Sequence, residues 1–376
     1  MVGPHGGPVT DPADGILGLG IDADPVFAEL IDAVRASAAD LGIATRDIRT
    51  TDDTDGIARL LLIGRPGRYR PFFGAREAVG AARIVWTGEP LPTVRARRTA
   101  ARAAATRPSA TAARHVVRPI GAVLRAVRLP GGLDRRRVAL TTDRLLRANL
   151  GELAMAATAG ARIVITSRDR AATLAAEGIE AAVVPFGYHE RHAGPLTAAG
   201  AGPRDVRLLM LGSRAGHTRR AREVAGLRRT EAGRDLTVVE GAWGDERAAL
   251  LRRTCVVVDV HRIPGNFVGL RLLLTLAAGA ALVTEPMTDP WPFVAGVHYL
   301  EAPASDVFDV AAGLADDDAR RVRLVEAGQA LLRGDLTMQA SLERVLAAAA
   351  GVIDARHAAY PRWRRPRPGI ATGGFA

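Results

Sequence analysis

The strongest constraint on the fold is an alternation of apolar and polar segments between residues 255 and 302. Residues 255–260 are a short apolar run rich in valine, which predicts a strand buried on both faces. Helix-forming residues follow over 270–278, and a second apolar run covers 280–283. Strand, helix and strand in this order predict a βαβ unit and therefore a parallel sheet. Because ligands bind beyond the carboxyl ends of such strands, we expect the loops 261–269 and 285–289 to line an active cleft.

The same alternation recurs along most of the chain and predicts an α/β protein with two Rossmann-like parallel-sheet domains facing a central cleft. A length of 376 residues favours two domains. We expect a first domain over residues 1–190 and a second over 203–350, joined by a hinge rich in glycine and proline. Residues 316–350 are helical by pattern. Residues 351–376 are expected to form a crossing segment or a loose tail.

Positive charge is concentrated in one segment of the first domain. The net charge is +11, and residues 90–137 hold 12 arginines against one acid, Asp134, which gives 12 − 1 = +11. We therefore treat residues 93–137 as an arginine-rich insert. Within it, residues 116–129 have the pattern of a basic amphipathic helix. Two interpretations stay open: peripheral contact with an anionic membrane or polyanion, and packing of the apolar face on the first domain.

Several classes of protein are disfavoured by composition. The single Cys255 cannot form an internal disulfide, and residues 1–15 lack the apolar core of a secretory signal. The longest apolar stretch, residues 272–283, is too short for a bilayer core of about 30 Å. Aromatic residues make up only 4%, which leaves few platforms for stacking bases and argues against nucleic acid. We expect a cytoplasmic protein, peripheral at the inner membrane face if the insert binds lipid.

A second candidate for ligand binding follows the predicted strand 206–211. Glycine allows close approach of a ligand to the backbone, a helix N-terminus favours an anion, and arginine grips phosphate oxygens in a bidentate manner. All three features occur together here, which predicts a diphosphate site. The residues are Gly212, Ser213, Arg214, Arg219 and Arg220. The alternative is that Arg219 and Arg220 belong to a solvated helix face.

The motifs together resemble a GT-B glycosyltransferase. They are V-P-F-G-Y-H at 184–189, L-G-S-R at 211–214 with R-R at 219–220, and H-R at 261–262 followed by R-L-L-L-T-L-A-A-G-A at 271–280. The pattern is most similar to the branch grouped with the spore-maturation protein CgeB, near the large retaining family four. This resemblance implies a nucleotide-sugar donor held by the second domain and an acceptor that faces the first.

The resemblance also assigns expected donor contacts in residues 261–271. It implies backbone contacts to the sugar and phosphates from Asn266, Phe267, Val268 and Gly269, and further donor contacts from His261 and Arg271. The chain departs from the family at Leu274, where a glutamate normally binds the ribose. A leucine accepts no hydrogen bond, so Glu285 is a substitute candidate. Asp289 resembles the loop that shapes the nucleobase pocket.

Glycosyl transfer requires stabilisation of the departing diphosphate and placement of an acceptor hydroxyl. Arginines and helix termini meet the first need, and no Asp-x-Asp pair is a convincing metal site, so we expect neither a metal nor another cofactor. Candidates for the base or acceptor contact are Asp22, Glu89 and His189, each after a predicted strand of the first domain. The resemblance favours retention of anomeric configuration. The acceptor class, whether glycan, lipid or small molecule, stays open.

Two rival hypotheses come from other functional classes. Leu274 is compatible with a GT-B-fold protein that has lost catalysis and serves in binding or assembly. The insert is compatible with a peripheral binder of anionic surfaces.

Overall fold

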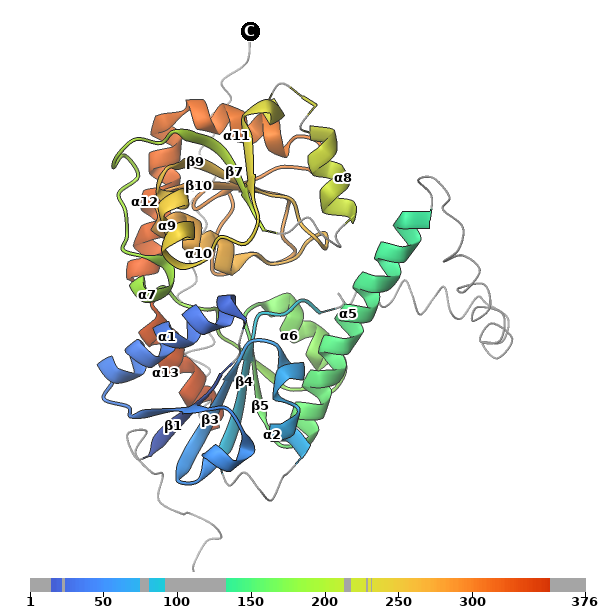
Figure 1. Cartoon of the computed structure of the whole chain (residues 1–376), viewed down its shortest axis with the longest axis vertical. Coiled ribbons are helices and arrows are strands. Elements are labelled where there is room, and N and C mark those ends of the chain that lie inside the picture. The colour runs from blue at the N-terminus through green and yellow to red at the C-terminus, as the bar shows by residue number, and fades with distance from the viewer. Residues whose placement is uncertain are drawn as a thin grey trace, which may run out of the picture.

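The computed structural model describes residues 15–21, 24–74, 81–91, 133–212, 218–227, 229–230 and 232–351. These residues form two β-sheets of parallel strands, each flanked by helices, and Figure 1 draws one above the other. The predicted fold class is therefore confirmed. Most of the arginine-rich insert, including its amphipathic segment 116–129, and the tail from 352 lie outside the described residues.

The first sheet has the strand order β2-β1-β3-β4-β5-β6. Its strands are β1 (Ile16–Gly20), β2 (Thr45–Ile48), β3 (Ile57–Ile63), β4 (Ala82–Thr87), β5 (Arg162–Ile165) and β6 (Ala181–Val183). The helices of this half are α1 (Pro25–Asp40), α2 (Pro71–Gly74), α5 (Leu133–Thr158), α6 (Arg168–Ala175) and α7 (Glu190–Ala193). The central strands β1, β3, β4 and β5 are mostly apolar, because α1 packs on one face of the sheet and α5 on the other.

The second sheet has the order β11-β10-β9-β7-β8. Its strands are β7 (Val206–Leu211), β8 (Leu236–Val239), β9 (Thr254–Asp259), β10 (Ala281–Thr284) and β11 (Leu300–Glu301). Its helices are α8 (Thr218–Leu227), α9 (Gly244–Arg252), α10 (Gly269–Ala277), α11 (Val307–Asp316) and α12 (Asp318–Arg333). The predicted unit at 255–283 is present as β9, α10 and β10, each shifted by one residue.

The helical pattern over 316–350 is not one helix. Asp317 accepts the backbone N–H of Arg320 and begins α12, and Thr337 accepts that of Ala340 and begins α13 (Met338–Ala349). Short polar side chains favour such N-cap positions over a helix interior, so the chain breaks at both.

Helix α13 packs on the first domain, not on the second. Met338, Leu342 and Val345 are fully buried in the core beneath the first sheet, against α1. The chain therefore crosses back before α13, whereas the expected boundary placed residues up to 350 in the second domain and the crossing after 351. The sequence pattern could not reveal this, because an apolar helix face is the same on either domain.

The crossing is fixed where the chain leaves the first sheet. Tyr188 exchanges backbone hydrogen bonds with Leu336 and Met338, at 2.7 Å each. Beside it, a Cβ on Gly187 would lie 2.2 Å from the Thr337 carbonyl oxygen. Residues 186–204, which the pattern of glycine and proline predicts as the hinge, are thus tightly packed at their start and contain α7.

We expect Gly187→Ala to lower the free energy of unfolding by about 2 kcal/mol, because backbone atoms cannot move aside as a flexible side chain can. Urea unfolding measures the change. Gly200→Ala is the matched control in the same segment, since its Cβ would meet nothing within 4 Å. Equal stability of the two variants would contradict the packing described here.

Candidate functional site

The strand orders place a topological switch point in each sheet. Strands β1 and β3 are neighbours in the first sheet and β7 and β9 in the second, and the strand order runs in opposite directions on the two sides of each pair. Ligands of doubly wound sheets bind beyond the carboxyl ends of such strands. A ligand site is therefore expected at the loops that follow these four strands.

On the second domain, a single buried carboxylate pairs with two arginines, and a third arginine follows it in the chain. Asp259, at the end of β9, forms ion pairs with Arg220 of α8 and Arg271 of α10. Arg262 follows in the next loop; it is exposed and makes no hydrogen bond or ion pair with the described residues. Burial, together with the nearby charge of Arg271, lowers the pKa of Arg220 to about 10. The group has more positive than negative charge.

Gly212, the residue after β7, lies beside these arginines. Its φ is +107°, a conformation that glycine adopts at little cost. A Cβ at this position would lie 3.4 Å from a terminal nitrogen of both Arg220 and Arg271. The backbone after β7 therefore passes directly beside two guanidinium groups. We call Gly212, Arg220, Asp259, Arg262 and Arg271 the arginine cluster.

A second set of contacts lies next to the cluster. Arg219 donates to both carboxylate oxygens of Glu285, at 2.9 and 2.5 Å, and to the His261 carbonyl at 2.6 Å. Glu285 also accepts the backbone N–H of His261 at 2.6 Å. The His261 ring contacts Thr284 Oγ1 at 2.8 Å, and burial lowers its pKa. These contacts hold the loop after β9 in place.

The first domain contributes an acid to the same region. Glu89 follows β4, is only 18% exposed, and lies 3.6 Å from Arg65, which also pairs with Asp24 at 2.8 Å. Burial raises the pKa of Glu89, although Arg65, Arg170 and Arg262 act to lower it. Because Arg262 belongs to the second domain, the arginine cluster and Glu89 lie within electrostatic reach of each other.

A buried arginine links the two domains at this point. Arg170 of α6 is 4% exposed and donates to Thr166 Oγ1 at 2.9 Å, to Asn266 Oδ1 at 2.9 Å and to the Phe267 carbonyl at 3.3 Å. Burial lowers its pKa, because all three of its hydrogen-bond partners are neutral. Arg168 makes a further contact between the domains, with its guanidinium 4.2 Å from the Trp291 ring centroid.

Comparison with known proteins identifies this architecture. Residues 210–347 match a family model described as "Glycosyl transferase-like". Among solved structures, Anabaena Alr3699/HepE in complex with UDP and glucose superposes with a TM-score of 0.57 at 9% identity, over 89% of this chain and 99% of that one. The chain has the GT-B glycosyltransferase fold.

Two other structures give the same result for this GT-B chain. Sucrose-phosphate synthase from Thermosynechococcus elongatus has a TM-score of 0.57 at 12% identity, over 91% of this chain and 100% of that one. The T4 phage β-glucosyltransferase has a TM-score of 0.52 at 10% identity, over 89% and 99%. No curated protein sequence matches the chain. The predicted GT-B fold is thus confirmed, and residues 210–347 are similar to the glycosyl transferase-like family; the CgeB-like subtype stays a prediction.

The GT-B structure brings several predicted site residues together. Gly212, Arg220 and Arg271 belong to the arginine cluster, Glu89 interacts electrostatically with Arg262 of that cluster, and Asn266 is held by Arg170. Arg219, His261 and Glu285 form the adjacent set, in which both Glu285 oxygens already have partners. Asp22, Ser213 and Arg214 lie outside the described residues.

Other predicted residues have packing or capping contacts. Phe267 and Leu274 are buried in the core of the second domain, the Val268 N–H contacts Met287 Sδ at 3.5 Å, and Gly269 begins α10. The His189 ring accepts the backbone N–H of Arg191 at 3.1 Å as the N-cap of α7. Asp289 accepts the Trp291 N–H at 3.1 Å.

Three residues of the candidate site were missed from the sequence, namely Arg65, Arg170 and Asp259, and Arg262 was included only as part of the loop 261–269, with no role of its own. Arg65, Asp259 and Arg262 had a usable signal, because each lies at the carboxyl end of a β-strand or within three residues of it. Arg170 had none, since it lies inside a helix of an arginine-rich chain.

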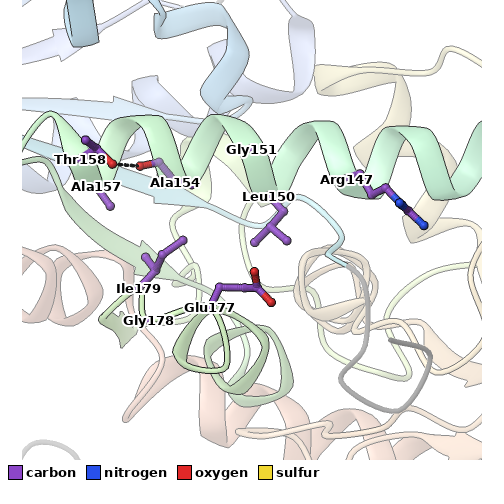
Figure 2. A pocket seen from close by; sticks show the side chains of 9 residues that line it. All are labelled: Arg147, Leu150, Gly151, Ala154, Ala157, Thr158, Glu177, Gly178 and Ile179. Carbon is purple, nitrogen blue, oxygen red and sulfur yellow. Dashed lines mark hydrogen bonds between the residues drawn. The ribbon is translucent and has the colours of Figure 1, made fainter. Parts of the chain in front are cut away.

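A groove of about 620 Å³ lies away from these residues, between α5 and the turn after α6 (Figure 2). Leu150, Ala154 and Ile179 line it together with Arg147 and Glu177. It contains none of the predicted site residues.

In the described part of the chain, no three His, Cys, Asp or Glu side chains are grouped as a metal site. No helix of that part is long and apolar enough to cross a membrane.

Proposed function

We propose that this protein transfers a sugar from a nucleotide-sugar donor to an acceptor hydroxyl. The arginine cluster carries the proposal: Arg220 and Arg271 share one buried carboxylate, Asp259, at the switch point of the second sheet, and Arg262 adds a third positive charge nearby. Excess positive charge in a partly buried site costs free energy unless an anion completes it. A nucleotide diphosphate has the charge and the geometry to do so.

The roles of the two domains follow from this placement. The Gly212 backbone and the arginine cluster would hold the donor diphosphate and stabilise it as it leaves, which supports a reaction without a metal. Glu89, on the first domain, would contact the acceptor hydroxyl. We infer retention of configuration from the family resemblance, and NMR of the product anomer tests it. The acceptor is a glycan, a lipid-linked sugar or a small molecule.

A cytoplasmic location and peripheral membrane contact through residues 116–129 are part of the proposal. Sedimentation with anionic vesicles tests the contact. If deletion of residues 94–132 leaves sedimentation unchanged while the remainder stays folded, the insert is not a membrane anchor.

We expect the protein to bind UDP, the nucleotide present in the Anabaena complex, and Arg271→Ala to weaken that binding about 10- to 100-fold. The loss corresponds to a charged hydrogen bond of about 1.5–3 kcal/mol. Titration calorimetry measures both affinities. Arg253→Ala is the control, because Arg253 is an exposed arginine whose side chain pairs with Asp205. If the wild-type protein binds none of UDP, GDP, ADP, CDP and dTDP, the proposal is wrong.

A second candidate is a GT-B protein without catalysis, and Leu274 favours it. Its side chain packs in the core and offers no hydrogen bond to a ribose. Release of nucleoside diphosphate from a nucleotide sugar at high protein concentration separates the two: the transferase releases it, whereas the inert protein binds without turnover.

A further inference from the structure

We propose that Arg170 of the first domain orients the side-chain amide of Asn266 so that its N–H groups donate to a phosphate oxygen of the donor. The inference rests on the proposed function, because it concerns the same donor site. It adds a positioning residue that lies on the opposite domain from the donor.

The contact between the two side chains fixes the direction of the amide. A guanidinium has N–H donors and no acceptor, so the Asn266 atom 2.9 Å from Arg170 must be the carbonyl oxygen, Oδ1. The amide nitrogen, Nδ2, is then the atom of the amide that points away from Arg170. Among the described residues, Nδ2 donates no hydrogen bond. Two N–H donors of a half-buried side chain are thus left for a ligand.

Arg170 is well suited to hold the amide because its own position is fixed. It is 4% exposed, and a second nitrogen donates to Thr166 Oγ1 at 2.9 Å. The Asn266 backbone is fixed as well, since its N–H donates to the Ile263 carbonyl at 3.1 Å and the Thr288 N–H donates to the Gly265 carbonyl at 3.0 Å. Neither partner is free to turn, so the amide has one orientation.

The neighbouring groups indicate what the Asn266 amide contacts. Asn266 lies in the loop between Arg262 and the first residue of α10, and that loop offers donors: the Arg262 guanidinium and the amides of the helix N-terminus. A loop that offers these donors favours an acceptor atom that carries negative charge. The diphosphate of the donor provides such an atom in the proposed reaction.

Asn266→Asp separates this role from simple packing between the domains. Aspartate keeps an oxygen for Arg170 and turns that contact into an ion pair, but it replaces the free N–H groups with a negative charge. We expect affinity for the nucleoside diphosphate to fall at least about tenfold, with no loss of thermal stability. If Asn266 served packing alone, the Asn266→Asp variant would bind as well as the wild type.

A double-mutant cycle tests whether Arg170 acts through Asn266. Arg170→Met and Asn266→Ala are each expected to weaken binding about three- to tenfold, and the double variant no more than Asn266→Ala alone. Additive losses would instead mean that Arg170 acts by its charge, which overturns the proposal. Arg168→Met removes another contact between the domains from the same helix and is expected to stay within about twofold.

The probe in these titrations is the nucleoside diphosphate that the wild-type protein binds most tightly among UDP, GDP, ADP, CDP and dTDP. If the wild type binds none, the proposed function fails and this inference fails with it. If the wild type binds and Asn266→Asp binds equally well, only the inference fails.

Discussion

Replacement of Asp259 by asparagine is expected to lower the free energy of unfolding by about 3–5 kcal/mol. Asparagine has the same shape, so the loss comes from charge: Arg220, 2% exposed, and Arg271 lose the one carboxylate that pairs with both. Leaving a buried cation without a partner costs more than the pair itself contributes. Urea unfolding at neutral pH, with circular dichroism as the signal, measures the change.

Arg220→Met is the matched comparison, and its cost is expected to be smaller. Asp259 would still pair with Arg271, so no charge is left alone. The double variant Arg220→Met with Asp259→Asn should recover part of the stability lost in Asp259→Asn, because one of the two unpaired cations is gone. Equal costs for the two single variants, or an additive double variant, would contradict the arrangement of charges in the arginine cluster.

The same carboxylate gives stability a defined dependence on pH. Burial acts to raise the pKa of Asp259, but Arg271 and Arg220 outweigh it and hold the pKa below the ordinary value of 3.8. A lowered folded-state pKa stabilises the protein above the ordinary value, and the contribution is lost as pH falls through the folded pKa. Asp259→Asn should therefore lack this acid-dependent loss.

The strands were predictable because of where they lie. Strands of a parallel sheet covered on both faces are continuous apolar runs, as in residues 254–259 and 281–284, and few other elements have that composition. Glycine at the end of α10 marked the helix stop correctly. The docking of α13 on the first domain was not predictable, because it depends on which apolar surface the helix meets after the crossing.

The sequence could indicate which loops line the candidate site, but not how their side chains pair. Loops after buried strands lie at the carboxyl rim, which located Gly212, Glu89 and the 261–271 stretch from the sequence alone. The partners of the arginines depend on contacts between distant segments. With 51 Lys and Arg residues in the chain, no local pattern distinguishes Arg170, which reaches the other domain, from an arginine on a solvated face.

Glu89→Gln is expected to reduce kcat/KM about 100-fold or more, the range for loss of a group that accepts a proton or hydrogen bond from the reacting hydroxyl. Burial raises the pKa of Glu89 above its ordinary value of 4.5, so the carboxylate needed for this role is lost as pH falls through that raised pKa. Wild-type activity should therefore show an acid limb above pH 4.5. The limb should be absent from the residual activity of Glu89→Gln.

The contribution of Glu89 to folding stability should depend on pH in the opposite direction to its contribution to activity. A carboxyl with a raised folded-state pKa favours the folded state at low pH, and that contribution is lost as pH rises through the folded pKa. At neutral pH the glutamine variant should be as stable as the wild type, or more so. The control is Glu152→Gln, because Glu152 is also an acid of the first domain that pairs with an arginine, Arg70, yet it is buried on α5, away from the candidate site. Glu152→Gln should lose stability and keep kcat/KM. An unchanged pH profile in Glu89→Gln would show that Glu89 is held in place for structure and that another group contacts the acceptor.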